Sequence, residues 1–122
     1  MCKILISINP EYVNKIFSGE KIYEFRKIKA KYKPDKIIIY CTAPVSAVVG
    51  EAAVTDILSE SPNDLWSITR HEGGVNEEFF FKYFKNKSIA IAYKLDKIIK
   101  YDKKIPLSEY GINFAPQSFV YL

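Results

Sequence analysis

Three charged side chains, Lys21, Glu24 and Arg26, lie close together in the sequence and have the chemistry of a binding or catalytic site. A guanidinium is a planar fork of donors and an ammonium is a compact charge, so Lys21 and Arg26 are candidates to contact a phosphate or the edge of a base. Glu24 can accept a hydrogen bond from a base or orient the two cations. A purely structural alternative is a partly buried Glu24–Arg26 ion pair that holds a strand, with Lys21 solvated.

The same residues can also support catalysis. A lysine beside a carboxylate can perform acid–base or hydrolytic chemistry when burial lowers the pKa of the lysine. Lys21 and Glu24 are therefore the candidate catalytic residues if the protein is an enzyme.

Other candidate binding residues carry hydroxyl or amide groups. Tyr40 and Thr42 share one face of a predicted strand and can present hydroxyls at its end, although Tyr40 can equally pack in the wall of a barrel. Gln117 and Ser118 follow Pro116, where they can read the edge of a ligand or cap neighbouring backbone groups. The complete set of predicted ligand- or RNA-binding residues is Lys21, Glu24, Arg26, Tyr40, Thr42, Gln117 and Ser118.

The elements that position these residues follow from hydrophobic periodicity and capping signals. We expect strands over 3–8, 22–26, 36–42, 47–58 and 88–99, a short extension over 103–107, and a final strand within 114–122. Gly50 and Glu51 indicate a bulge or bend in the fourth strand. Helices are predicted to begin at Asn9, Ser61 and Asn76, and Gly19 ends the first.

This order of elements predicts the α+β class. We expect one domain over residues 1–122, with a small mixed, mostly antiparallel β-barrel and two to three flanking helices. The aromatic stripe Phe79, Phe80, Tyr83 and Phe84 on the third helix is interpreted as core.

Composition restricts the partners. A formal charge of +4 favours an anionic partner such as nucleic acid, but the lysines are spread over the chain and a solvated basic surface explains them equally well. Two isolated cysteines, Cys2 and Cys41, indicate a reducing compartment. No signal peptide or membrane-length apolar run is present, so we expect a soluble, cytoplasmic protein without a membrane partner. The lone His71 argues against a metal site, and we expect no cofactor.

The segment 19–26, GEKIYEFR, resembles the signature of ASCH domains. That signature has a glycine, a lysine two positions later and an arginine at the end of the following strand, after a short helix such as the one that follows Ile8-Asn9-Pro10. The segments Tyr40-Cys41-Thr42, Val48-Val49-Gly50-Glu51 and Pro116-Gln117-Ser118-Phe119 also resemble the family's strands. The resemblance implies a PUA-like fold, as in small stand-alone members, with RNA or a nucleotide bound in a polar, basic cleft beside the barrel.

Two alternatives to simple binding stay open. ASCH relatives include an amidohydrolase of acetylated cytidine that uses a lysine, a threonine and a glutamate. Here Glu24 takes the place of the threonine, and the segment that supplies the glutamate has Gly73 and Gly74, with Glu72 only nearby. A small hydrolase acting on modified nucleosides or RNA is thus one alternative, and a ligand-sensing regulatory domain is the other.

Overall fold

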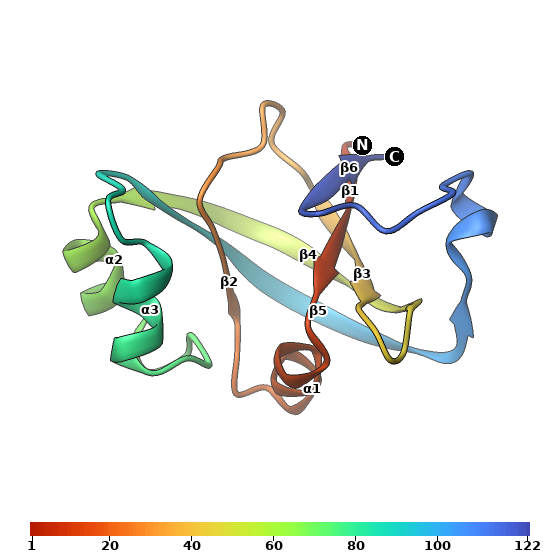
Figure 1. Ribbon diagram of the computed structural model, residues 1–122, viewed down its shortest axis with the longest axis horizontal. Helices are drawn as coiled ribbons and strands as arrows, with labels where there is room; N and C mark the ends of the chain where they lie inside the picture. The colour runs from red at the N-terminus through yellow and green to blue at the C-terminus, as the bar shows by residue number, and fades with distance from the viewer.

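The computed structural model describes all 122 residues as one curled sheet with helices at its face and end (Figure 1). The sheet contains six strands, in the spatial order β2-β5-β4-β3-β1-β6. The β1 strand is parallel to β3, and every other neighbouring pair is antiparallel. The elements are β1 (Lys3–Ile8), α1 (Pro10–Ser18), β2 (Tyr23–Arg26), β3 (Lys36–Cys41), β4 (Ala47–Glu60), α2 (Pro62–Thr69), α3 (Glu77–Tyr83), β5 (Ala90–Ile105), the 3-10 helix η1 (Leu107–Tyr110) and β6 (Phe119–Tyr121).

The predicted bend in the long strand is present, and it curls the sheet into a half-barrel. The register between β4 and β5 shifts three times, and the first shift lies between Val48 and Gly50. Gly50 is required there because a Cβ atom at this position would collide with the carbonyl oxygen of Ile99 and the ring of Phe17. The α+β class and the mostly antiparallel arrangement are confirmed, with β2 at one edge of the sheet and β6 at the other.

Helix α1 packs on the concave face of the sheet. Its buried residues Val13 and Ile16 join the main core cluster with Ile4, Ile6 and other strand residues. Gly19 ends the helix with φ +87°, a conformation that glycine adopts without strain. Asn9 occupies the N-cap position, but its side chain accepts a hydrogen bond from Thr42 Oγ1 instead of capping the helix.

Helices α2 and α3 lie together at one end of the molecule (Figure 1) and enclose a second core. Both predicted caps are confirmed: Ser61 Oγ accepts from the backbone N–H of Asp64, and the Asn76 side chain accepts from that of Phe79. Phe80 and Phe84 are buried, but Phe79 is 42% exposed. The prediction that the whole aromatic stripe is core is therefore wrong for Phe79, because the stripe is wider than the helix face that the core covers.

Several predicted boundaries also need correction. The expected strands over 88–99 and 103–107 form one continuous strand, β5, and η1 was not predicted. Thr42 follows the end of β3, and the last strand covers only Phe119–Tyr121. None of the helices has the length and apolar character needed to cross a membrane.

Candidate functional site

A cleft of about 280 Å³ opens between α1, α3, β2 and the end of β1, with the segment before β6 at its margin. Its polar lining comes from β1 and the following residue (Ser7, Asn9), from the region of β2 (Lys21, Glu24, Arg26) and from Gln117. Its apolar wall includes the aromatic residues Tyr12, Phe25, Phe79 and Tyr83. Segments far apart in the chain therefore meet around one hollow.

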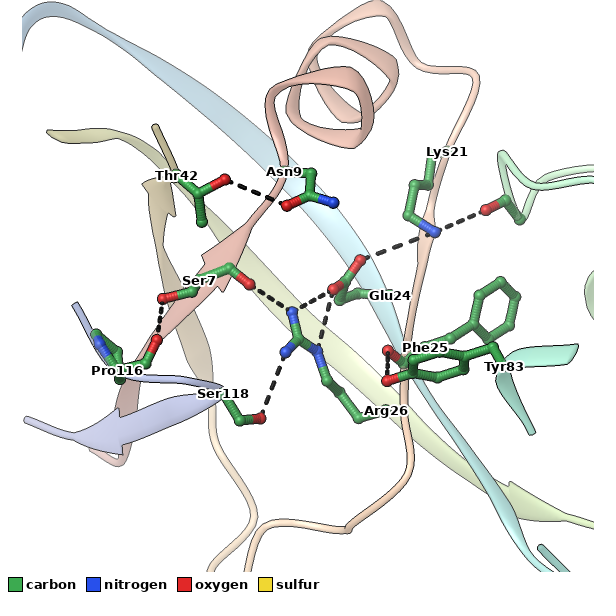
Figure 2. Close-up of polar contacts among 11 residues, drawn as sticks. Ser7, Asn9, Lys21, Glu24, Phe25, Arg26, Thr42, Tyr83, Pro116 and Ser118 are labelled. Atoms are coloured by element: carbon green, nitrogen blue, oxygen red, sulfur yellow. Dashed lines mark hydrogen bonds and ion pairs between the residues drawn. The ribbon is translucent and has the colours of Figure 1, made fainter. Parts of the chain in front are cut away.

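Lys21 is the most unusual residue in this cleft, because it is a lysine with only 2% of its surface exposed. Its Nζ donates a hydrogen bond of 2.7 Å to the carbonyl oxygen of Gly73 and lies 3.8 Å from Glu24 Oε1. The ammonium also lies 4.6 Å from the centre of the Phe25 ring, a cation–π contact. Figure 2 shows the Lys21 ammonium directed towards Glu24.

Burial lowers the pKa of Lys21 to about 8, and the negative charge of Glu24 opposes part of this effect. A buried lysine whose pKa lies near neutrality has a substantial neutral fraction at slightly alkaline pH. Its amine can then accept a proton, which an ordinary exposed lysine rarely does.

Glu24 and Arg26 form a tight ion pair beside Lys21. Glu24 Oε2 accepts hydrogen bonds from Arg26 NH2 at 2.6 Å and Nε at 3.1 Å. The Glu24 carboxylate thus uses one oxygen for Arg26 and faces Lys21 with the other, so it orients both cations (Figure 2). The side chains of the pair are 7% and 12% exposed, which makes this a largely buried ion pair.

Arg26 also ties together the two sides of the half-barrel. Its NH2 donates to the backbone oxygen of Ser7 at 2.7 Å, and its NH1 donates to Ser118 Oγ at 3.3 Å. Four of the five guanidinium N–H groups are therefore engaged within the protein. Arg26 therefore holds the cleft in shape, whereas the Lys21 ammonium makes one hydrogen bond within the protein, to the carbonyl oxygen of Gly73.

Lys21 reaches the cleft because it lies outside β2. Strict alternation along a strand places Lys21 on the face opposite to Glu24 and Arg26, but the structure brings all three together. Lys21 forms an isolated bridge with Gly73, in the loop between α2 and α3, and the regular pleat begins only at Tyr23. The structural alternative predicted a solvated Lys21, and this prediction is wrong because Lys21 is buried.

The Gly73–Gly74 loop fits closely around Lys21. Gly74 has φ +70°, and a Cβ atom there would lie 2.7 Å from Lys21 Cβ. Lys15 Nζ donates to the carbonyl oxygen of Gly74 at 3.0 Å, which holds the loop from the α1 side. The backbone of this loop, through the Gly73 carbonyl, supplies the hydrogen-bond acceptor for the buried ammonium.

The other predicted site residues differ in how near they lie to the cleft. Gln117 lines the cleft, and Ser118 accepts a hydrogen bond from Arg26, which also lines it. Thr42 is at its margin, hydrogen-bonded to Asn9. Tyr40 is not brought together with the others, because it is buried in the cluster on the outer face of the sheet.

Sequence reasoning missed the aromatic wall of the cleft. Phe79 and Tyr83 stack with ring centres 6.1 Å apart, and Tyr12 lies 5.8 Å from Phe79. Burial raises the pKa of Tyr12 and of Tyr83, so both hydroxyls stay protonated near neutral pH. The sequence did carry a signal for this wall. Phe79 and Tyr83 are four residues apart and so share one face of the helix, next to the face that carries Phe80 and Phe84.

No group of three or more histidine, cysteine, aspartate or glutamate side chains is arranged to hold a metal ion. The polar groups that converge in the cleft are instead one lysine, one arginine, one glutamate and neutral hydroxyl or amide groups.

Comparison with known proteins identifies related chains over nearly the full length. An ASCH domain-containing ribonuclease of Zymomonas mobilis is 34% identical over 97% of this chain and 82% of its own length. The ATP synthase subunit alpha of Ureaplasma parvum is 32% identical over 98% of this chain, which spans only 15% of that relative.

Solved structures show the same fold. The crystal structure of ASCH from Zymomonas mobilis matches with a TM-score of 0.89 and 33% identity, covering 98% of this chain and 87% of that chain. The N-terminal domain of Staphylothermus marinus McrB has a TM-score of 0.52 at 15% identity over 88% of this chain and 77% of that chain, a likeness in fold alone. Residues 6–106 match the family described as ASCH domain. The chain therefore belongs to the ASCH domain family, and its half-barrel is the PUA-like fold expected from segment 19–26.

Proposed function

We propose that this protein cleaves single-stranded RNA in the cleft, with Lys21 as the catalytic base. The observation that carries the proposal is the buried ammonium of Lys21 at the cleft, with a pKa of about 8. The related Zymomonas mobilis protein, named a ribonuclease, supports an RNA substrate, since the match covers most of both chains. The Ureaplasma parvum relative adds no functional argument, because this chain matches only 15% of its length.

The chemistry of the cleft suits an unpaired nucleotide. Aromatic rings offer stacking surfaces for bases without strong sequence preference, and Tyr12, Phe79 and Tyr83 provide such surfaces along one wall. Lys21 and Arg26 line the same cleft and offer positive charge to the phosphate that accompanies each base. A cleft of about 280 Å³ admits one nucleotide and not a paired duplex, so we expect single-stranded RNA as the substrate.

The proposed reaction is an internal transfer at phosphorus. The ribose 2′-oxygen attacks the adjacent phosphorus, a P–O2′ bond forms and the P–O5′ bond breaks. The neutral Lys21 amine takes the 2′-hydroxyl proton, and a solvent water gives a proton to the departing 5′-oxygen. The Lys21 ammonium then returns its proton to the hydroxide so formed, which regenerates the neutral amine. The products are a 2′,3′-cyclic phosphate and a 5′-hydroxyl, and no oxidant or external nucleophile is consumed.

The neighbouring residues support this step by position and charge. Once Lys21 has taken the proton, its positive charge offsets the charge that develops on the phosphate oxygens. Glu24 orients Lys21, and Arg26 is a positioning residue that fixes Glu24 through two hydrogen bonds. The remaining free N–H of Arg26 is available to a phosphate oxygen.

The direct test is cleavage of an unstructured, fluorescent RNA oligonucleotide. We expect Lys21→Met to reduce the cleavage rate at least 100-fold, the size of effect that a positioned acid–base group provides. Lys36→Met, prepared in the same way, is the matched control, because Lys36 is paired with Glu51 outside the cleft. Equal rates for wild type and Lys21→Met would reject the proposal and reveal a contaminating nuclease.

The same assay separates the other sequence-based hypotheses. Binding measured by fluorescence anisotropy, with no products, would support an RNA-binding module instead of an enzyme. Release of acetate from acetylcytidine, with intact RNA, would assign Lys21 to amide hydrolysis.

A further inference from the structure

The connection between β2 and β3 is an exposed basic segment next to the cleft. It has lysines at alternate positions, Lys27, Lys29, Lys31 and Lys33, and all four are exposed. We call residues 27–33 the lysine arm. In Figure 1 it lies in the loop that rises above the sheet between β2 and β3.

The backbone of the lysine arm is fixed to the sheet. The N–H of Ala30 donates at 3.0 Å to the hydroxyl of Tyr93, a fully buried residue of β5. The N–H of Tyr32 donates at 3.0 Å to the hydroxyl of Tyr121 in β6. The arm therefore holds its lysines over a defined surface, and ordering it on a ligand requires little further loss of backbone entropy.

The charge of the lysine arm is not neutralised within the protein. The ion pairs of the molecule involve Lys15, Lys21, Arg26 and Lys36, and no carboxylate lies within 4.0 Å of any of the four arm ammonium groups. Asp35, the nearest acidic residue in sequence, instead accepts a hydrogen bond from the backbone N–H of Cys2. Four like charges on one short segment produce a local positive potential that attracts an anionic polymer.

The lysine arm begins at the margin of the cleft. Lys27 directly follows Arg26, which lines the cleft. The Nζ of Lys27 lies 4.7 Å from the ring centre of Tyr83, another lining residue. A chain that has one nucleotide in the cleft can therefore continue along the arm towards β6.

We propose that the lysine arm binds the phosphate backbone of the RNA strand that extends from the cleft. This inference rests on the proposed function, because it takes RNA to be the occupant of the cleft. It specifies that the substrate is a polymer of several nucleotides and not only the dinucleotide that the cleavage step itself requires. Each lysine that neutralises a phosphate releases counterions, so binding along the arm is strongly salt-dependent and independent of base sequence.

The test measures binding of an unstructured 2′-O-methyl 12-mer, which cannot undergo the proposed cleavage, by fluorescence anisotropy from low to high salt. The arm variant is Lys29→Gln/Lys31→Gln, which leaves Lys27 and its contact with Tyr83 in place. The matched control is Lys103→Gln/Lys104→Gln, which removes the same charge from exposed positions on β5.

For single strands, the slope of log affinity against log salt concentration changes by about 0.7 for each phosphate contact. We therefore expect the slope of the arm variant to be smaller in magnitude by about 1.4, and its affinity at 0.1 M salt to be roughly 20-fold lower. The control variant keeps the slope of wild type. Equal slopes for the arm and control variants would overturn the inference.

Cleavage of a dinucleotide distinguishes this inference from the proposed function. Because a dinucleotide occupies mainly the cleft, the arm variant should lose far less kcat/KM with it than with a cleavable 12-mer. Equal losses with both substrates would contradict the arm as a polymer site. If wild type cleaves the dinucleotide but does not bind the 12-mer more tightly, the lysine arm is rejected while the proposed function stands.

Discussion

Two polar clusters with similar residue types occur in this protein, and they differ in burial and in the distance between the lysine and its carboxylate partner. In the cleft, Lys21 and Arg26 share Glu24. On the outer face of the sheet, Lys36 contacts Glu51 at 2.5 Å, and Tyr101 donates to the same carboxylate at 2.7 Å. Each cluster thus has a glutamate between two partners.

The outer cluster forms close contacts that lower the pKa of Glu51, chiefly through its hydrogen bonds with Lys36 and Tyr101. Lys36 keeps 30% of its side chain exposed, so it stays hydrated. Lys21 is buried, with its carboxylate partner at a longer 3.8 Å, and its pKa falls. The same residue types therefore produce a hydrated ion pair where the contact is close, and a buried amine with a lowered pKa where the carboxylate is farther away.

The largest expected difference between the clusters is in stability after loss of one cation. Arg26→Gln leaves the Glu24 carboxylate buried without its closest partner, and breaking a buried pair destabilises a protein by about 3 kcal/mol or more. Lys36→Gln removes a partner from a more exposed pair and should change the free energy of unfolding by about 1 kcal/mol or less. Urea unfolding of both variants measures this, and equal losses would refute the contrast.

An intermediate loss of stability is expected when Gly74, which packs against the Lys21 side chain, is replaced. Gly74→Ala combines strain at positive φ with crowding against the Lys21 side chain, so we expect a loss of about 2 kcal/mol and reduced cleavage. Gly19→Ala is the control, since φ is +87° there but no atom lies within 4 Å of the added Cβ. It should lose only about 1 kcal/mol in thermal or urea unfolding. Identical losses would show that the loop does not shape the Lys21 position.

The smallest effect concerns the acid dependence of the outer cluster. The folded-state pKa of Glu51 lies below its unfolded value of about 4.5. The ionised Glu51 therefore stabilises the folded state above pH 4.5, and this stabilisation is lost as the pH falls through the folded-state pKa. Wild type should exceed Glu51→Gln by about 1 kcal/mol at pH 7, and the difference should vanish in acid. A difference that is constant with pH would exclude an electrostatic origin.

Sequence reasoning predicted the features that are set locally. The caps at Ser61 and Asn76, the end of α1 at Gly19 and the bend at Gly50 depend on neighbouring residues or on steric limits of one position. Periodicity then gave the correct order of strands and helices apart from η1, and hence the α+β class. The segment 19–26 identified the family.

The features that were missed depend on contacts distant in sequence. The burial of Lys21 requires Gly73, 52 positions away, whose carbonyl no sequence pattern identifies as an acceptor. Tyr40 was placed near the cleft because alternation indicates which residues share a face, but it does not indicate which face carries the site. Phe79 was placed in the core because an apolar side chain that lines a cleft has the same pattern as one that is buried.

The most direct test of the central claim is the pH dependence of kcat/KM for RNA cleavage, which reports the pKa of the catalytic base in the free enzyme. In the proposed reaction only the neutral form of Lys21 accepts the 2′-hydroxyl proton, so kcat/KM should rise about tenfold per pH unit below a midpoint near 8 and then level off. A rate that falls with pH over this range, or a midpoint at the ordinary lysine value of 10.5, would contradict the account.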